Sequence, residues 1–329
     1  MMAREDYNEI RAQFDRYLEC MRAGDAAALE QVFDPECKCF LSTVKAYPDG
    51  GQHSLYGISD FVRDRPQADE FHIRVCNYIC NISGEQAHQT AAVVCRAVKY
   101  VGADDLQYFE YTQQYSNAWQ KTEQGWRCIE MRMDLPDHHG DFSDFSDLWF
   151  YEEGKAKWFA GVHLPCISGE LDSPWVRIPE PENVLTDEEQ ILAAVSRYAF
   201  GIDTVSFSNL PEAISKDIVV NMAPWGAMDY REFIATLKYH RQPDRYWTHP
   251  CKLESCEIHG DAADLRLYRM SGHRQRNHPL VLTRENCNHE FACARYEIKM
   301  KRENGAWKIA RLDYLLGIID LGEFEAGNT

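Results

Sequence analysis

Hydrophobic residues follow one pattern that occurs twice along the chain. Residues 9–132 and residues 190–313 each begin with apolar positions three or four apart, the spacing of an amphipathic helix with one buried face. In both helices an arginine precedes a tyrosine, and these two tyrosines lie 181 positions apart. The apolar positions are Ile10, Phe14, Tyr17, Leu18 and Met21 in the first copy and Ile191, Val195, Tyr198 and Ile202 in the second. The pattern therefore predicts a tandem repeat.

The same order of elements follows the first helix in both copies. A short helix comes next, and strands follow it with hairpin turns at Gly84 and Gly260. Each copy ends in two long strands, whose turns lie at Gly125 and Gly305. The expected elements are short helices around 25–33 and 209–214, strands 90–100, 111–119 and 126–131 in the first copy, and strands 264–270, 292–301 and 307–312 in the second. This order predicts an α+β fold of two tandem cone-shaped α+β barrels, each a curved antiparallel sheet capped by N-terminal helices.

The segment between the copies loses this periodicity. Three prolines in residues 172–185 restrict the backbone, so we expect an extended connector there. Residues 142–162 are rich in aromatic side chains, which we expect to pack across a domain surface or close the mouth of a cavity; an exposed partner-binding patch is the alternative. Thr186-Asp-Glu-Glu189 has the sequence of a capping box that starts the next helix. The expected parts are a first cone in 1–135, a connector in 136–185 and a second cone in 186–329.

Composition narrows the class of protein. A length of 329 residues fits two domains, and a net charge of −17 without clustered Lys and Arg argues against nucleic acid or a membrane surface as a partner. The N-terminal sequence lacks the order of a signal peptide, so we expect a cytoplasmic protein. The twelve cysteines contain no CxxC pair and are expected to pack as small hydrophobic residues. His138 and His139 are interpreted as part of a polar loop, and we expect no metal site.

Short motifs in the second copy resemble those of a known family. They are Arg197-Tyr-Ala-Phe-Gly-Ile-Asp203, Trp247-Thr-His249, Gly260-Asp-Ala262, Arg295-Tyr296 and Gly305-Ala-Trp-Lys-Ile-Ala-Arg311. With these motifs the chain resembles the SnoaL-like branch of the nuclear transport factor 2-like superfamily, duplicated in tandem over about three quarters of its length. The resemblance implies a fold first, because this cone hosts dehydratases, isomerases, cyclases, hydrolases, dioxygenase small subunits and inert binders.

Within that family the second copy is most similar to the group that includes bile-acid dehydratase and scytalone dehydratase. Those enzymes use a tyrosine and an aspartate from the first helix and a histidine at the start of a cavity-facing strand. The resemblance implies these catalytic roles for Tyr198, Asp203 and His249. The residue types suit the chemistry, because a neutral imidazole can take a proton α to a carbonyl, a carboxylate can orient it, and a phenol can polarise the carbonyl oxygen.

Further residues are candidates for the same site. His249 and His273 each lie 12 positions from Asp261, so an unbulged hairpin would set them on adjacent strands, similar to the paired histidines of scytalone dehydratase. A bulge would remove this inference. Arg295 could bind a carboxylate or a thioester phosphate, and an exposed ladder position is the alternative. The remaining candidate substrate-binding residues are Tyr268, Trp247 and Tyr296.

The first copy departs from this set. The offset of 181 places Arg22 where Asp203 stands. The strand register leaves the counterpart of the strand histidine open, on or beside His72 and Ile73. We therefore expect a degenerate copy with a structural or binding role, in which Tyr17, Tyr111 and Tyr115 could still line a cavity together with His72.

The function expected from these observations is that of a lyase (dehydratase) or isomerase without a cofactor. Its partner would be a small hydrophobic oxygenated ligand, of steroid, polyketide or terpenoid type. The alternative is a non-catalytic small-molecule-binding or assembly protein, in which the two cones form an intrachain pseudo-dimer; a homo-oligomer is open in both cases. Taken singly, each candidate side chain also has an ordinary structural explanation. An enzyme needs His249 and Asp203 within reach of one another inside a pocket, which a binder does not.

Overall fold

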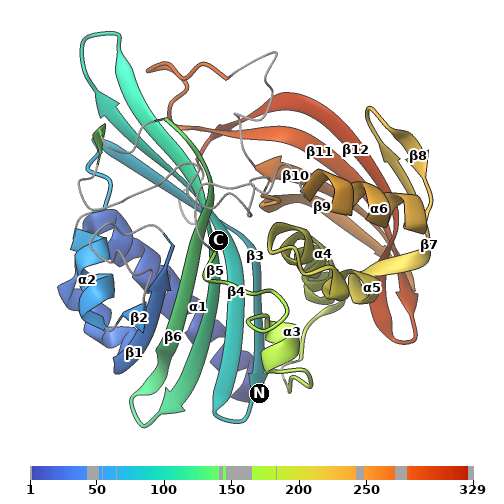
Figure 1. Cartoon of the computed structure of the whole chain (residues 1–329), viewed down its shortest axis with the longest axis horizontal. Coiled ribbons are helices and arrows are strands. Elements are labelled where there is room, and N and C mark those ends of the chain that lie inside the picture. Colours follow the sequence, from blue (N-terminus) through green and yellow to red (C-terminus); the bar gives the residue numbers. More distant parts are fainter. Residues whose placement is uncertain are drawn as a thin grey trace. The chain divides into compact units, whose positions relative to one another are not determined.

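The computed structural model divides into two compact units, Met1–Val184 and Leu185–Thr329. Each unit is a curved sheet with helices packed against it (Figure 1). The residues that the structure describes are 2–42, 52–53, 55–63, 65–140, 144–145, 165–182, 184–241, 248–270 and 280–324.

The first unit contains a six-stranded sheet in the order β2-β1-β6-β5-β4-β3. All neighbouring strands are antiparallel except β1 and β6, which are parallel. Its elements are α1 (Met2–Ala23), η1 (Ala27–Gln31), β1 (Phe33–Leu41), β2 (Gln52–His53), α2 (Leu55–Arg63), β3 (Glu70–Ser83), β4 (Gln86–Tyr100), β5 (Leu106–Thr122), β6 (Gly125–His139) and α3 (Pro174–Arg177).

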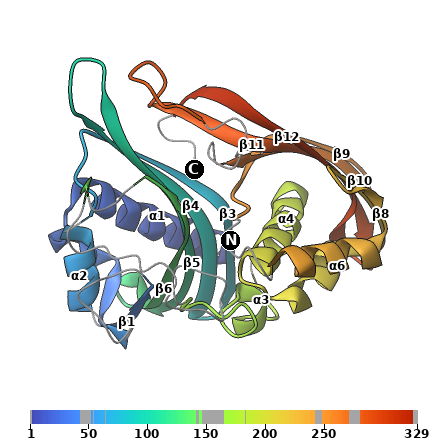
Figure 2. The same cartoon turned by 45° about the horizontal axis from the view of Figure 1, so that its top comes forward.

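The second unit repeats this topology. Its sheet has the order β8-β7-β12-β11-β10-β9, and β7 and β12 are the parallel pair. Its elements are α4 (Asp187–Asp203), η3 (Phe207–Asn209), α5 (Leu210–Ala213), β7 (Ile214–Met222), β8 (Gly226–Met228), α6 (Tyr230–Arg241), β9 (Cys251–His259), β10 (Ala262–Met270), β11 (His289–Glu303) and β12 (Ala306–Glu323). Helices α4 and α6 lie on the concave side of this sheet (Figure 2). The predicted tandem α+β fold is confirmed.

The two sheets differ from the prediction in one respect. They are mixed and open, whereas the sequence predicts cone-shaped barrels of curved antiparallel sheet. The cause is the first strand of each unit, which inserts beside the last strand and runs parallel to it. In the first unit this strand, β1, is difficult to predict from the sequence. It contains Asp34, Pro35 and Glu36, and its register against β6 shifts between Phe33 and Lys38.

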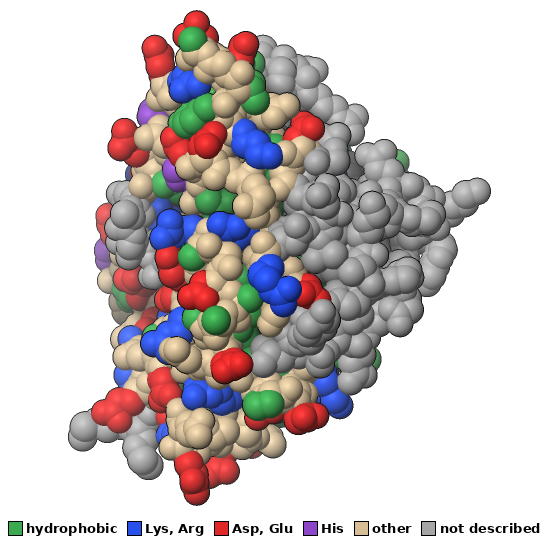
Figure 3. Space-filling model, turned by 90° about the vertical axis from the view of Figure 1, so that its left-hand side faces the viewer, with side chains coloured by type: hydrophobic (Ala, Val, Ile, Leu, Met, Phe, Trp, Pro, Cys, Tyr) green, Lys and Arg blue, Asp and Glu red, His purple; other side chains and the backbone are tan. Residues whose placement is uncertain are grey.

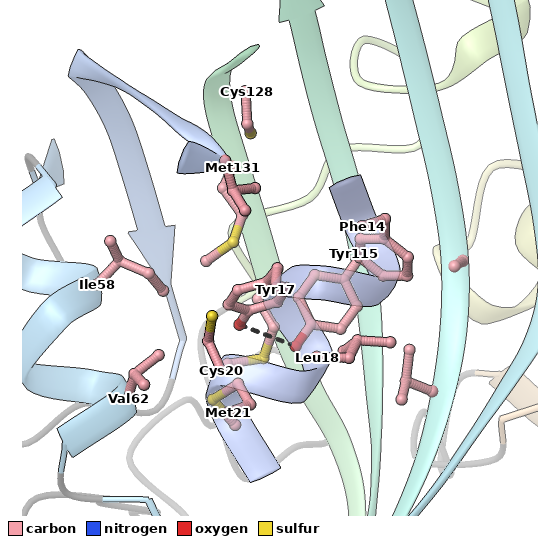
Figure 4. Packing of buried hydrophobic residues seen from close by; sticks show 14 of the residues in the cluster. Phe14, Tyr17, Leu18, Cys20, Met21, Ile58, Val62, Tyr115, Cys128 and Met131 are labelled. Atoms are coloured by element: carbon pink, nitrogen blue, oxygen red, sulfur yellow. Dashed lines mark hydrogen bonds between the residues drawn. The ribbon is translucent and has the colours of Figure 1, made fainter. Parts of the chain in front are cut away.

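The core of the first unit is filled by aromatic, aliphatic and sulfur-containing side chains (Figure 4). Phe14 and Tyr17 of α1 pack against Tyr115 of β5, and the two tyrosine hydroxyls lie 3.2 Å apart. Ile58 and Val62 bring α2 into the same core. The apolar stripe read from the sequence is therefore the buried face of α1.

The core of the second unit is built from the corresponding stripe on α4. Thr186 caps this helix, since its hydroxyl accepts from the Glu189 backbone while the Glu189 carboxylate accepts from the Thr186 backbone. Gly201 sits where α4 meets the next turn, and a Cβ there would come within 2.9 Å of Leu210 and 3.1 Å of the Ser206 carbonyl. The predicted capping box is confirmed, and the glycine permits a close contact between the helix and the residues that follow it.

The connector is part of the first unit as far as the structure describes it. Strand β6 continues to His139, and the described residues 165–182 belong to the same compact unit. Asn81 of β3 donates to the carbonyls of Pro174 and Ile178, and Asp134 of β6 accepts from the backbone N–H of Cys166. Most of the aromatic stretch 142–162 lies outside the described residues.

The face shown in Figure 3 carries acidic and basic side chains interspersed with one another. Within the described residues, no helix is long and apolar enough to cross a membrane.

Candidate active site in the second unit

A buried carboxylate holds a histidine in the second unit. Asp203 is the last residue of α4, and His249 lies two residues before β9. The backbone N–H of His249 donates to Asp203 Oδ2 at 2.7 Å, and His249 Nδ1 lies 2.5 Å from Asp203 Oδ1. The side chains are 2% exposed for Asp203 and 9% for His249. Because an ionised carboxylate only accepts hydrogen bonds, it fixes Nδ1 as the donor of this contact, and in the neutral form of the ring the lone pair is then on Nε2.

Tyr198 lies beside this pair. Its ring centroid is 6.4 Å from that of His249 and 6.2 Å from that of Phe233 on α6. Burial raises the pKa of the Tyr198 phenol, with the Arg269 charge opposing the shift, so the hydroxyl is neutral at neutral pH and can donate a hydrogen bond. The structure thus brings Tyr198, Asp203 and His249 together.

Arg269 completes the cluster from β10. It pairs with Cys251 of β9 and Ala294 of β11, and it lies on the same face of the strand as the core residue Leu267. The side chain is buried, and both Nε (2.8 Å) and Nη2 donate to the carbonyl of Thr248, the residue before His249. Arg269 therefore fastens the segment that carries the histidine.

Two tyrosines whose rings are in tilted contact lie next to Arg269. Tyr296 of β11 pairs with Tyr314 of β12, and their ring centroids are 5.0 Å apart. Burial raises the pKa of both phenols, that of Tyr314 to about 12, while the Arg269 charge opposes the rise. Burial alone would lower the pKa of the Arg269 guanidinium, but Tyr296, Tyr314 and Asp203 are among the groups that hold it above its usual value. The guanidinium is therefore charged in a site of neutral phenols.

Cys251 is the thiol of this cluster. Burial raises its pKa to about 12, so it is a neutral thiol and a poor nucleophile at neutral pH. No group of three or more His, Cys, Asp or Glu side chains in the described part of the chain is arranged to hold a metal ion.

Two further candidates from the sequence, Tyr268 and Arg295, do not join the cluster. Tyr268 and Arg295 pair with one another on the opposite face of the sheet, where Arg295 donates to Glu297 at 2.9 Å. A surface depression lined by Glu257, Arg266 and Asp313, among others, involves that outer face and not the buried cluster. Trp247 and His273 lie outside the described residues. The hairpin has a bulge between Arg266 and Leu267, so the symmetric register argued for His273 does not hold.

Arg269 and Tyr314 are members of the cluster that the sequence reasoning missed. One signal was present, because Arg269 continues an alternating series of inward positions after Ala263, Leu265 and Leu267. An arginine at an apolar-face position is either paired or functional.

The first unit lacks the charged members of this cluster. By the 181 offset, Tyr115 matches Tyr296 and Met133 matches Tyr314, and these residues pair across their strands in the same way. Arg269 lies two residues after Leu267, the strand partner of Tyr296. In the first unit, Val93 lies two residues after Ala91, the strand partner of Tyr115, so Val93 corresponds to Arg269. His72 Nε2 lies within hydrogen-bond distance of Glu70 Oε2 on the same strand (3.0 Å), and burial lowers the pKa of its imidazole.

The geometry defines an α+β protein with a buried Asp-His pair inside one of two similar units. The chain belongs to the SnoaL-like domain family: the family's model matches residues 2–132 and again residues 183–313.

Several solved structures match about 40% of the chain at low identity. A nuclear transport factor 2-like superfamily protein from Salmonella enterica serovar Typhimurium is 19% identical, with 40% of this chain and 92% of that chain covered and a TM-score of 0.33. A protein proposed to be a scytalone dehydratase from Novosphingobium aromaticivorans is 11% identical (46% and 94% covered, TM-score 0.34). The CaMKII hub of S. rosetta is 20% identical (39% and 95% covered, TM-score 0.31). Among curated proteins, none matches the chain.

Proposed function

We propose that the second unit is a dehydratase or isomerase that removes a proton next to a carbonyl group. The observation that carries this proposal is the buried contact in which Asp203 accepts from both the ring and the backbone of His249. A carboxylate in this position fixes the orientation of the imidazole and stabilises the imidazolium formed when the ring takes a proton.

In the proposed reaction, His249 Nε2 takes the α-proton and the C–H electron pair forms the enolate. In a dehydration, the β-hydroxyl leaves with the C–O electron pair and takes the proton from the imidazolium, giving water. In an isomerisation, the imidazolium returns the proton to a different carbon. Tyr198, neutral because it is buried, donates a hydrogen bond to the substrate oxygen.

The surroundings of the pair support a hydrophobic substrate. Phe233, Leu267 and Tyr296 belong to the same buried cluster as Tyr198. An aromatic and aliphatic lining suits an oxygenated ring compound of steroid, polyketide or terpenoid type.

The proposal is tested by hydrogen exchange at the substrate carbon. The protein is incubated in D2O with a panel of steroid and aromatic polyketide ketones, and loss of the α-proton is followed by NMR. His249→Gln should slow the exchange by about 10²–10⁴-fold, because the general base is removed while a neutral side chain of similar size remains.

The matched control is His259→Gln, since His259 lies at the β9–β10 turn with a side chain 60% exposed. It should exchange the α-proton at the wild-type rate. Exchange at the wild-type rate in His249→Gln would remove the acid-base role. Ligand binding without exchange across the whole panel would favour a non-catalytic binding protein.

For the first unit we propose a structural role. Its interior is packed with apolar and aromatic side chains, and Val93 and Met133 stand where the second unit has Arg269 and Tyr314.

A further inference from the structure

We infer that Arg269 and Tyr314 form an oxyanion site, and that the substrate is an enolisable carbonyl compound, a ketone or thioester, whose oxygen becomes negatively charged during the reaction. This inference rests on the proposed function and names the substrate class of the same site. In this inference, the two residues stabilise the negative charge that proton removal creates on the substrate oxygen.

The first argument is the burial of the Arg269 charge. The residue is 3% exposed, and the hydrogen-bond acceptors that the described residues give it are neutral, the carbonyl of Thr248 and the hydroxyl of Tyr314. A guanidinium has five N–H donors, and these two neutral oxygens leave its charge uncompensated by an anion bound to it directly. The carboxylate of this cluster, Asp203, already accepts hydrogen bonds from the backbone and the ring of His249. A buried cation with donor capacity to spare favours an anionic oxygen beside it.

The second argument is the Tyr314 hydroxyl. It is buried, its oxygen can accept a hydrogen bond only from the Arg269 guanidinium beside it, and the described residues give its O–H no acceptor. Burial keeps the phenol protonated, and the nearby Arg269 charge opposes the pKa rise, so a neutral donor lies close to the guanidinium. Buried polar groups in native proteins nearly always have partners, which makes a ligand oxygen a fitting acceptor.

The third argument comes from the duplication. The first unit builds the same six-stranded sheet with Val93 and Met133 at the two positions. The fold therefore does not require a buried arginine or a tyrosine hydroxyl here. Their presence in the unit that also has the Asp203–His249 pair links them to that pair's chemistry.

The test measures the ionisation state of a bound phenol, because a phenolate imitates the charge and shape of an enolate. The probe is 4-nitrophenol, whose ionised form is distinguished from the neutral form by its visible absorbance. The wild-type protein should bind the phenolate in preference to the neutral phenol, and it should therefore lower the apparent pKa of the probe by about one unit or more. Arg269→Met should weaken phenolate binding roughly tenfold to hundredfold.

Two variants keep the test decisive. Tyr314→Phe removes only the hydroxyl, and it should weaken phenolate binding severalfold with an unchanged thermal midpoint; it carries the test if Arg269→Met does not fold. Arg295→Met is the matched control, since this arginine lies on the neighbouring strand and on the opposite face, and it should bind the probe as the wild type does. An equal loss in Arg295→Met would overturn the inference.

The inference is also overturned if the bound probe stays neutral, if the wild type does not bind it, or if Arg269→Met and Tyr314→Phe bind the phenolate like the wild type. Its failure is separable from that of the proposed function. His249→Gln should lose proton exchange and keep phenolate binding. Phenolate binding through Arg269 without any exchange would leave the oxyanion site standing and remove the catalytic proposal.

Discussion

His88 is buried on β4 beside Asn81 of the neighbouring strand, in the first unit. Burial lowers its pKa to about 3, and the positive charge of Arg177 adds to the shift. In the unfolded chain the ring would protonate near its ordinary value of 6.5. As the pH falls below 6.5, the unfolded state therefore takes up a proton that the folded state does not, and the free energy of unfolding decreases until about pH 3.

From this shift we expect His88 to cost about 2 kcal/mol of stability between pH 7 and pH 5. Urea unfolding at the two pH values measures it. His88→Gln should unfold with a smaller pH dependence than the wild type by that amount, and His259→Gln, which changes an exposed histidine, should keep the wild-type dependence. Equal pH dependence in His88→Gln and the wild type would show that His88 is not the titrating group.

The candidate site was partly predictable at the level of single residues. Tyr198 and Asp203 lie close together in sequence on one helix, and the family resemblance supplied His249 at the start of a strand. Arg269 and Tyr314 come from strands whose register is set by bulges and by pairing over long sequence separations. A pattern along the chain does not encode those pairings, so neither residue could be placed beside His249 beforehand.

Among the elements, α4 allows the sharpest test of local stabilisation. Thr186→Ala removes the hydroxyl that accepts from the Glu189 backbone, leaving an N–H at the helix start without its cap. We expect the second unit to lose about 1 kcal/mol of unfolding free energy, measured by its urea midpoint. Thr186→Ser keeps the hydroxyl and should match the wild type. A midpoint in Thr186→Ala equal to that of the wild type would mean that tertiary packing alone fixes the helix start.

Elements with strong local signals were predicted, and elements that depend on tertiary contacts were not. The hairpin glycines Gly84 and Gly260 adopt positive φ at the expected turns, because few other residues tolerate that conformation. The strands β1 and β7 and the helices α2 and α6 were missed. Each of the two strands has a register shift against the strand beside it, which interrupts its alternation. Helix α2 has only nine residues and α6 only twelve, lengths at which a helix depends on tertiary packing.

At the scale of the whole molecule, each unit has its own core and its own large buried tryptophan. Trp126 is fully buried in the first unit, and Trp307 is 3% exposed in the second. We expect Trp126→Ala and Trp307→Ala each to cost about 3–5 kcal/mol by opening a cavity in its own unit. Hydrogen exchange read by mass spectrometry should show lost protection in β3–β6 for the first variant and in β9–β12 for the second.

These two variants serve as controls for one another, since each leaves the other core intact. Loss of protection in both units from either single change would contradict independent cores. An unshifted unfolding midpoint would show that the replaced tryptophan is not part of a hydrophobic core.

The place of the last strand has a consequence for synthesis. Among the described residues β12 is the last strand of the second unit, yet it lies in the middle of the sheet, between β7 and β11. While a ribosome is still making residues 306–323, the earlier strands can form only two separate pieces, β7 with β8 and β9 to β11. Contacts of such long sequence separation form slowly. A nascent chain stopped just before β12 should therefore expose the edges of β7 and β11 and be a substrate for chaperones and proteases, although most of its residues have already been made.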